Sequence, residues 1–171
     1  QQVSLKNQFN EYWYAGKAEI SSYTLEQARY GEMRSGNAVL IFVTEPFSEK
    51  KQVKLDNPQR AGEDKVTVMK LNFTKKFETC IYPYSMMLSS FTPVDQYNYP
   101  NTLKATMSGQ EWCGQVFAQM NLEKDKYRVQ SFSYFESEGD EKFTIKNALL
   151  EDEIWNKIRL DYQSLPTGEV E

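Results

Sequence analysis

The segment GQEWCGQVFAQMNLEKDKYRVQSFSYFESEGD, residues 109–140, decides the fold expected for this chain. Both halves of the segment can be read as alternating side chains, which is the period of an extended strand. The charged residues 123–126 between the halves indicate a turn. The segment therefore predicts two long antiparallel strands. Because neither strand has a plainly polar face, we expect both faces to be at least partly covered.

Further strands are predicted on both sides of this hairpin, in meander order. The most apolar run, residues 38–43, is expected to be buried on both faces in the middle of a sheet, and Pro46 is expected to end it. Residues 24–33 also fit a short helix, and residues 1–8 are expected to be frayed. The other predicted strands are residues 16–27, 52–55, 65–77, 80–91, 102–107 and 142–146.

One helix is predicted near the end of the chain, over residues 148–158. Asn147 is expected to cap it, and Leu150, Ile154 and Ile158 form one apolar stripe that can lie on a sheet. The fold class is therefore mainly β, with α+β as the alternative. We expect a barrel-like or strongly curved antiparallel sheet of about eight strands, in a single domain over residues 1–171. This domain is either complete or the N-terminal part of a longer chain.

Composition excludes several kinds of chemistry. The 171 residues contain no histidine and only two cysteines. Hydrolysis by a serine or cysteine that is paired with histidine is therefore impossible within this chain, and so is a four-ligand zinc site of the usual kind. The net charge of -4 does not favour nucleic-acid binding. We expect a protein that is not an enzyme and that needs no cofactor and no metal.

Cys80 and Cys113 both lie in predicted strands. In an exported protein they are candidates for a disulfide between neighbouring strands. The alternative is two buried free thiols that act as small apolar side chains. A nucleophilic Cys113 is not expected, because the chain has no histidine to activate the thiol.

Two groups of residues are candidates for a ligand or partner surface. Lysine and arginine outnumber aspartate and glutamate between residues 49 and 76, which favours either contact with acidic lipid headgroups or a solvated strand edge that lysines protect. Aromatic residues in a predicted loop are the least expected in a core, although core packing explains most other aromatic side chains. The candidate surface residues are Tyr97, Tyr99, Trp112, Lys50, Lys51 and Lys54.

The compartment is expected to be outside the cytoplasm. The sequence begins with Gln1 rather than methionine, as it would after removal of a signal peptide or at the boundary of a longer chain. No apolar run reaches the ~18 residues that a membrane-spanning helix needs.

Several stretches together resemble a family of exported Bacteroidetes proteins of unknown function. They are EYWYAGKAEISSYTLEQARYGE, AVLIFVTEPF, KKFETCIYPYSMM, QEWCGQVF, SYFESEGD and LPTGEVE. Members often carry the label of the septum-formation inhibitor Maf, which implies an α/β nucleotide pyrophosphatase with a basic Ser-Arg signature near the N-terminus. This chain has no such signature. The resemblance implies a periplasmic or outer-membrane-associated protein, and it carries over no site residue.

Three functions are consistent with these observations. The leading hypothesis is a non-catalytic cell-envelope binding protein, or a subunit of an envelope complex, with an envelope protein as partner and peripheral membrane association. The alternative is a β-barrel carrier of an apolar or lipidic ligand, lined by Met86, Met87 and Met120 among others. The third is a carboxylate-dependent hydrolase, which requires two acids that face each other across a cleft.

Overall fold

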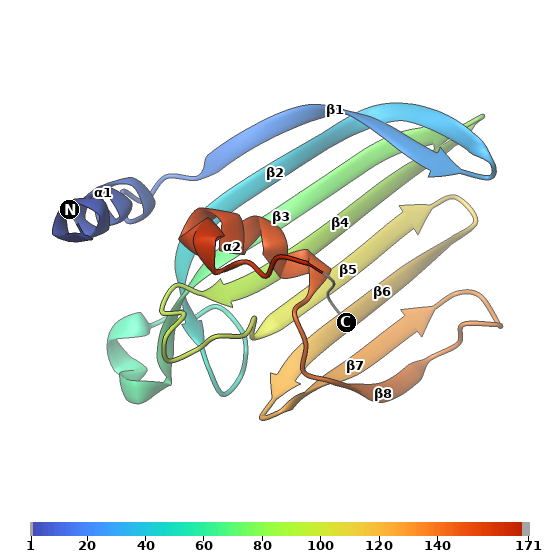
Figure 1. Cartoon of the computed structure of the whole chain (residues 1–171). Helices are drawn as coiled ribbons and strands as arrows, with labels where there is room; N and C mark the ends of the chain where they lie inside the picture. Colours follow the sequence, from blue (N-terminus) through green and yellow to red (C-terminus); the bar gives the residue numbers. More distant parts are fainter. Residues whose placement is uncertain (1, 169–171) are drawn as a thin grey trace.

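A computed structural model describes residues 2–168, with side chains from residue 7 onward. Eight strands form one antiparallel sheet in the order β1-β2-β3-β4-β5-β6-β7-β8, so each strand pairs with its neighbours in sequence (Figure 1). This confirms the mainly β fold, the meander and the C-terminal helix. The strands are β1 (Glu19–Arg29), β2 (Glu32–Ser48), β3 (Lys65–Thr79), β4 (Tyr82–Pro93), β5 (Lys104–Glu111), β6 (Gly114–Glu123), β7 (Lys126–Ser133) and β8 (Glu141–Lys146).

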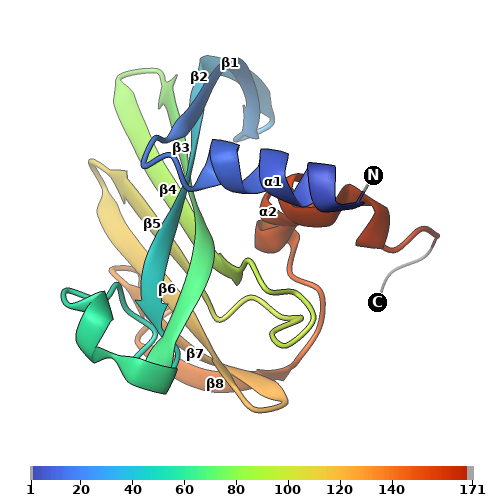
Figure 2. The same ribbon diagram turned by 90° about the vertical axis from the view of Figure 1, so that its left-hand side faces the viewer.

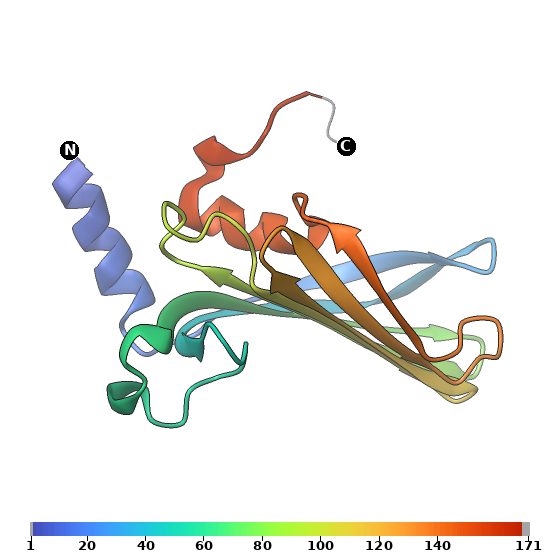
Figure 3. The same ribbon diagram turned by 90° about the horizontal axis from the view of Figure 1, so that it is seen from below.

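The sheet is open and is not strongly curled, so the barrel-like form of the prediction is wrong (Figure 3). Strands β1 and β8 are the two edges and do not pair with each other. Tight turns between sequence neighbours produce the meander. Closure into a barrel would require β1 to pair with β8, and local alternation does not encode that contact.

The two faces of the sheet are covered by different segments. Helix α2 (Ile154–Asp161) lies on one face, here called the helix face, together with α1 (Gln2–Trp13) (Figure 2). The loop of residues 49–64 lies on the opposite face, here called the back face (Figure 3). A cluster of Phe47, Val66 and Val68 is buried on the back face, together with Leu103.

The N-terminal segment is a helix rather than the frayed end that the sequence predicted. Trp13, near the end of α1, is buried against Leu40, Phe42 and Met69 of the helix face, and Phe9 packs against the same cluster. Residues 9 and 13 are one turn apart, so both rings reach the sheet. The alternative of a helix over residues 24–33 is also wrong, because β1 and β2 form a hairpin there.

Strand β2 continues through Pro46 to Ser48, against the prediction that proline would end it. Strand β1 pairs with β2 only as far as Phe42, so at Pro46 that side of β2 has no neighbouring strand. The Pro46 carbonyl accepts a hydrogen bond from the Leu55 amide, and in extended backbone the nitrogen of a residue points to the same side as its carbonyl. The N–H that proline lacks is therefore not needed by the sheet.

The other strand predictions hold, apart from three details. In the segment 109–140, Trp112 and Cys113 form a turn between β5 and β6, so the first half of that segment is not one strand. Residues 52–55 form no strand and contribute one isolated bridge, between Phe47 and Lys54. In the run 38–43, Ala38, Leu40 and Phe42 are buried on the helix face, whereas the residues between them are only half-buried on the back face. The run is therefore inside the sheet but is not fully covered on both sides.

Helix α2 begins at Ile154, after a 3-10 turn at Glu151–Glu153, and Asn147 does not cap it. The predicted stripe is also wrong at Ile158, which is exposed. Leu160 packs on the apolar cluster of the helix face, whereas the fully buried helix residue is the polar Asn156. The Asn156 Nδ2 donates to Ser90 Oγ at 3.1 Å and to Thr92 Oγ1 at 2.9 Å. The sheet presents hydroxyl groups at this place, so hydrogen bonds replace apolar packing.

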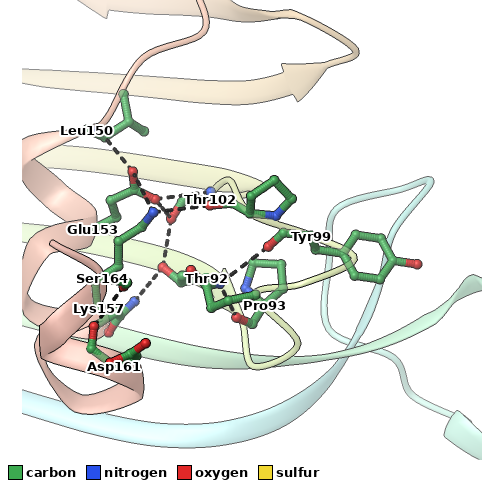
Figure 4. A network of polar contacts seen from close by, with 12 residues as sticks. Thr92, Pro93, Tyr99, Thr102, Leu150, Glu153, Lys157, Asp161 and Ser164 are labelled. Atoms are coloured by element: carbon green, nitrogen blue, oxygen red, sulfur yellow. Dashed lines mark hydrogen bonds and ion pairs between the residues drawn. The ribbon is translucent and has the colours of Figure 1, made fainter. Parts of the chain in front are cut away.

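A buried carboxylate joins α2 to the loop between β4 and β5 (Figure 4). Glu153 is 1% exposed, and it accepts from the backbone N–H of Thr102 at 3.1 Å and from the Thr102 hydroxyl at 2.6 Å. Its other oxygen accepts from the backbone N–H of Leu150 at 3.1 Å and lies 3.7 Å from Lys157 Nζ. The Tyr127 hydroxyl donates to the Thr102 carbonyl, and burial raises the pKa of Tyr127 well above its usual range.

Candidate ligand-binding groove

A groove of about 370 Å³ lies on the helix face, at the end of the sheet where the turns β1–β2, β3–β4 and β5–β6 come together. Its floor is formed by side chains from β3, β4, β5 and β6 that point to the helix face. They are mainly apolar: Phe77, Tyr84, Met86, Met107 and Val116. A shallower and more polar depression beside α1 is larger, about 790 Å³, and lies near Phe9, Tyr14 and Tyr99.

The strand register produces this apolar floor. Phe77 pairs with Tyr84 across β3 and β4, and their rings stack with centroids 4.9 Å apart and planes 7° apart. Met86 and Val116 both pair with Gly109 of β5, from opposite sides. Because glycine has no side chain, the groove has depth between the methionine and the valine. A Cβ at Gly109 would lie 3.1 Å from the Val116 side chain.

The tip of the β1–β2 hairpin forms one wall. Tyr30 and Gly31 both have positive φ, 54° and 75°, which is the backbone of a type I′ two-residue turn. The Tyr30 and Tyr84 hydroxyl oxygens lie 3.0 Å apart in a hydrogen bond. Tyr84 belongs to β4, so the tip crosses the end of β3 and covers the stacked rings.

Charged groups surround the apolar floor. The Arg29 guanidinium lies 4.6 Å from the Tyr30 ring centroid and 5.4 Å from that of Tyr84. A hydrogen bond with Tyr84 raises the pKa of Arg29, and burial together with the Tyr30 hydroxyl raises the pKa of Tyr84. Arg29 therefore stays cationic and Tyr84 stays a neutral phenol at physiological pH. Lys75, Glu111 and Glu138 complete the polar rim.

The candidate disulfide between Cys80 and Cys113 is absent. Cys80 and Cys113 are both free and exposed, in the turns of two different hairpins, so the alternative of two buried thiols is wrong as well. Cys80 has a φ of 56°, which suits a tight turn. Desolvation by neighbouring atoms and the nearby Glu111 carboxylate raise the pKa of the Cys113 thiol, which makes a thiolate nucleophile less favourable.

The candidate residues for a ligand or partner surface lie at opposite ends of the sheet. Trp112 is exposed in the β5–β6 turn and meets Tyr82 edge-on. Tyr97 and Tyr99 lie in the β4–β5 loop at the other end, where Tyr97 is exposed and Tyr99 donates to Glu49. The three lysines belong to the loop after β2: Lys50, Lys51 and Lys54, the last paired with Glu45 at 3.2 Å.

Sequence reasoning identified only part of the groove. Of the methionines expected to line a cavity, Met86 does so, whereas Met87 points to the back face and Met120 packs near Tyr127. The signal that was missed is the pairing of a glycine with bulky apolar residues on both neighbouring strands. That pattern becomes visible only when the strand register is known.

No family model, curated protein or solved structure was found to match this chain. Within residues 2–168, no group of three or more cysteine, aspartate or glutamate side chains has the geometry to hold a metal ion. In the same residues, no helix is long and apolar enough to cross a bilayer.

Proposed function

We propose that this protein is a non-catalytic binding protein of the cell envelope that holds an apolar or lipidic ligand in the groove on its helix face. The observation that carries the proposal is the groove floor, where Phe77, Tyr84, Met86 and Val116 surround the space above Gly109. Ligand sites are commonly concave, mostly apolar and bordered by a few polar groups. The sequence suggested a ligand site inside a barrel, and the proposed site is instead this open groove.

The location in the envelope rests on the resemblance of several sequence stretches to exported proteins. The absence of histidine from the sequence supports a binding role rather than turnover. In this proposal, an envelope protein receives the ligand or docks on the protein. Cell fractionation of the native organism tests the location, and recovery of the protein in the cytoplasm would contradict it.

Binding is tested with N-phenyl-1-naphthylamine, a dye that fluoresces in apolar sites, and with its displacement by fatty acids. Met86→Glu places a carboxylate in the groove, and Met87→Glu places the same group on the back face of the same strand. We expect about a tenfold or larger loss of dye affinity for M86E and little change for M87E. Equal affinity in both variants, or no binding by the unaltered protein, would exclude the groove as the site.

A carboxylate-dependent hydrolase is the second candidate, because Glu111 and Glu138 both line the groove. If the protein acts this way, Glu111→Gln and Glu138→Gln abolish turnover of ester or glycoside substrates and leave dye binding intact. No turnover by the unaltered protein over a broad substrate panel excludes this candidate and leaves the binding proposal standing.

A further inference from the structure

Strand β1 presents a long free edge. It has 11 residues, Glu19–Arg29, and within residues 2–168 no strand pairs with its outer side. Proteins normally protect such an edge with lysine, proline or a bulge. Strand β1 contains no lysine or proline, and its register with β2 is continuous from Glu19 to Arg29. The other edge, β8, has only six residues and carries Lys142 and Lys146.

The direction of each backbone group follows from the turn. In a type I′ hairpin the residues that flank the turn, here Arg29 and Glu32, form a hydrogen-bonded pair. Arg29 and every second residue before it therefore bond to β2. The residues whose N–H and C=O groups point to the free side are Ile20, Ser22, Thr24, Glu26 and Ala28.

We infer that β1 pairs with β1 of a second copy of this chain, antiparallel, around a two-fold axis at Thr24. In this register Thr24 faces Thr24, and Ser22 faces Glu26 of the other copy. All five outward residues then pair with outward residues, which gives about ten new backbone hydrogen bonds. A shift by two residues in either direction leaves one outward pair unmatched at the end of the strand.

The side chains agree with the same register. Tyr23 faces Leu25 of the other copy on the helix face, and Ile20 faces Ala28 on the back face, each twice because of the symmetry. Tyr23 and Ile20 are 52% and 65% exposed in the single chain, so pairing would cover apolar surface on both faces.

The ends of the strand carry opposite charges that meet in this register. Glu19 faces Arg29 of the other copy. Glu19 already accepts hydrogen bonds from Arg159 at 2.7 Å and from Tyr12 at 3.0 Å. Its pairing with Arg29 of the other copy therefore helps to select the register but adds little to the affinity of the dimer. A register shifted towards the N-terminus would instead place Ile20 opposite Glu26, an apolar group against a charge.

The resulting dimer is one continuous sheet. A two-fold axis perpendicular to the sheet keeps both helix faces on the same side, so the two α2 helices and the two grooves open in the same direction. The inference does not rest on the proposed ligand. Gln27, Ala28 and Arg29 of β1 also line the groove, but Thr24, where the test substitutions are made, does not.

Sedimentation equilibrium over a wide protein concentration range tests the association. Thr24→Lys puts two like charges opposite each other on the axis, and Thr24→Val is the matched control with a similar shape. We expect a dimer for the unaltered protein and for T24V, and at least tenfold weaker association for T24K. A monomer at all concentrations, open-ended oligomers, or a dimer that T24K leaves unchanged would each overturn the inference.

Cross-linking tests the register in a background in which Cys80 and Cys113 are replaced by serine. A short bis-maleimide should link Thr24→Cys to itself efficiently. Ser22→Cys and Glu26→Cys should each cross-link poorly alone and well when the two variants are mixed. Efficient self-linking of S22C would mean a different register, and no cross-linking by any variant would mean that the edges do not meet.

Discussion

Removal of the buried Glu153 carboxylate should destabilise the protein strongly. Glu153→Ala leaves two buried backbone N–H groups, of Thr102 and Leu150, without an acceptor, whereas the Thr102 hydroxyl keeps its contact with Thr92 at 2.7 Å. An unsatisfied buried donor costs about 1–3 kcal/mol, so the expected loss in the free energy of unfolding is about 3–5 kcal/mol. Glu153→Gln keeps the shape and one acceptor oxygen, and should cost about 1–2 kcal/mol.

Urea denaturation followed by tryptophan fluorescence measures this loss, and Trp155 in α2 makes the signal sensitive to release of the helix. The matched control is Glu151→Ala, two residues earlier in the same 3-10 turn and exposed, which should change stability by less than about 0.5 kcal/mol. If the E153A and E151A variants unfold at the same urea concentration, the carboxylate does not hold the helix to the sheet and the reasoning is refuted.

The other predictions concern the close contact of β2 with β3, one loop and the thiols. Gly36→Ala should lower the free energy of unfolding by about 1–3 kcal/mol in urea denaturation, because a Cβ there would lie 2.1 Å from the Lys76 carbonyl oxygen; an unchanged midpoint would refute the close approach. Hydrogen bonds from the Lys50 N–H and from Ser48 lower the pKa of Asp64. Ionised Asp64 therefore stabilises the protein above its unfolded-state pKa of 3.8, and this stability is lost as the pH falls through the lower pKa of the folded state. The unaltered protein and Asp64→Asn should converge in stability under acid. A constant difference between them from pH 2 to pH 7 would contradict this. Cys80 and Cys113 should both react with a thiol reagent in the native protein, and two inaccessible thiols would show that the turns are placed wrongly.

The candidate groove illustrates why sites are harder to predict than strands. Met86 and Met87 are neighbours in sequence, yet they lie on opposite faces of β4, and only Met86 reaches the groove. Sequence alternation alone cannot say which of the two faces carries α2. Sequence alternation does not predict Arg29 as a site residue, because Arg29 reaches the groove only through the fold of the β1–β2 tip across β3.

The same reason explains the wrong prediction for the two cysteines. Both lie close to strongly alternating runs, and a strand extended by one or two residues includes them. The observed strands β4 and β6 begin later, at Tyr82 and Gly114, and the turns before them place both thiols at the surface. A turn of two residues carries little sequence signal when it contains neither proline nor an Asn-Gly pair.

By itself the amino-acid sequence determined the mainly β fold, the meander order and the single C-terminal helix, because alternation and short turns act between residues that are close along the chain. Only the tertiary structure decided that the sheet stays open, that α1 packs on it through Trp13, and that Gly109 lies between Met86 and Val116. These features depend on contacts between segments far apart in sequence, and their energy comes from surfaces that exist only after the strands have paired. Alternation with a period of two predicts where a strand runs, but it does not predict which segment packs on either face of the strand.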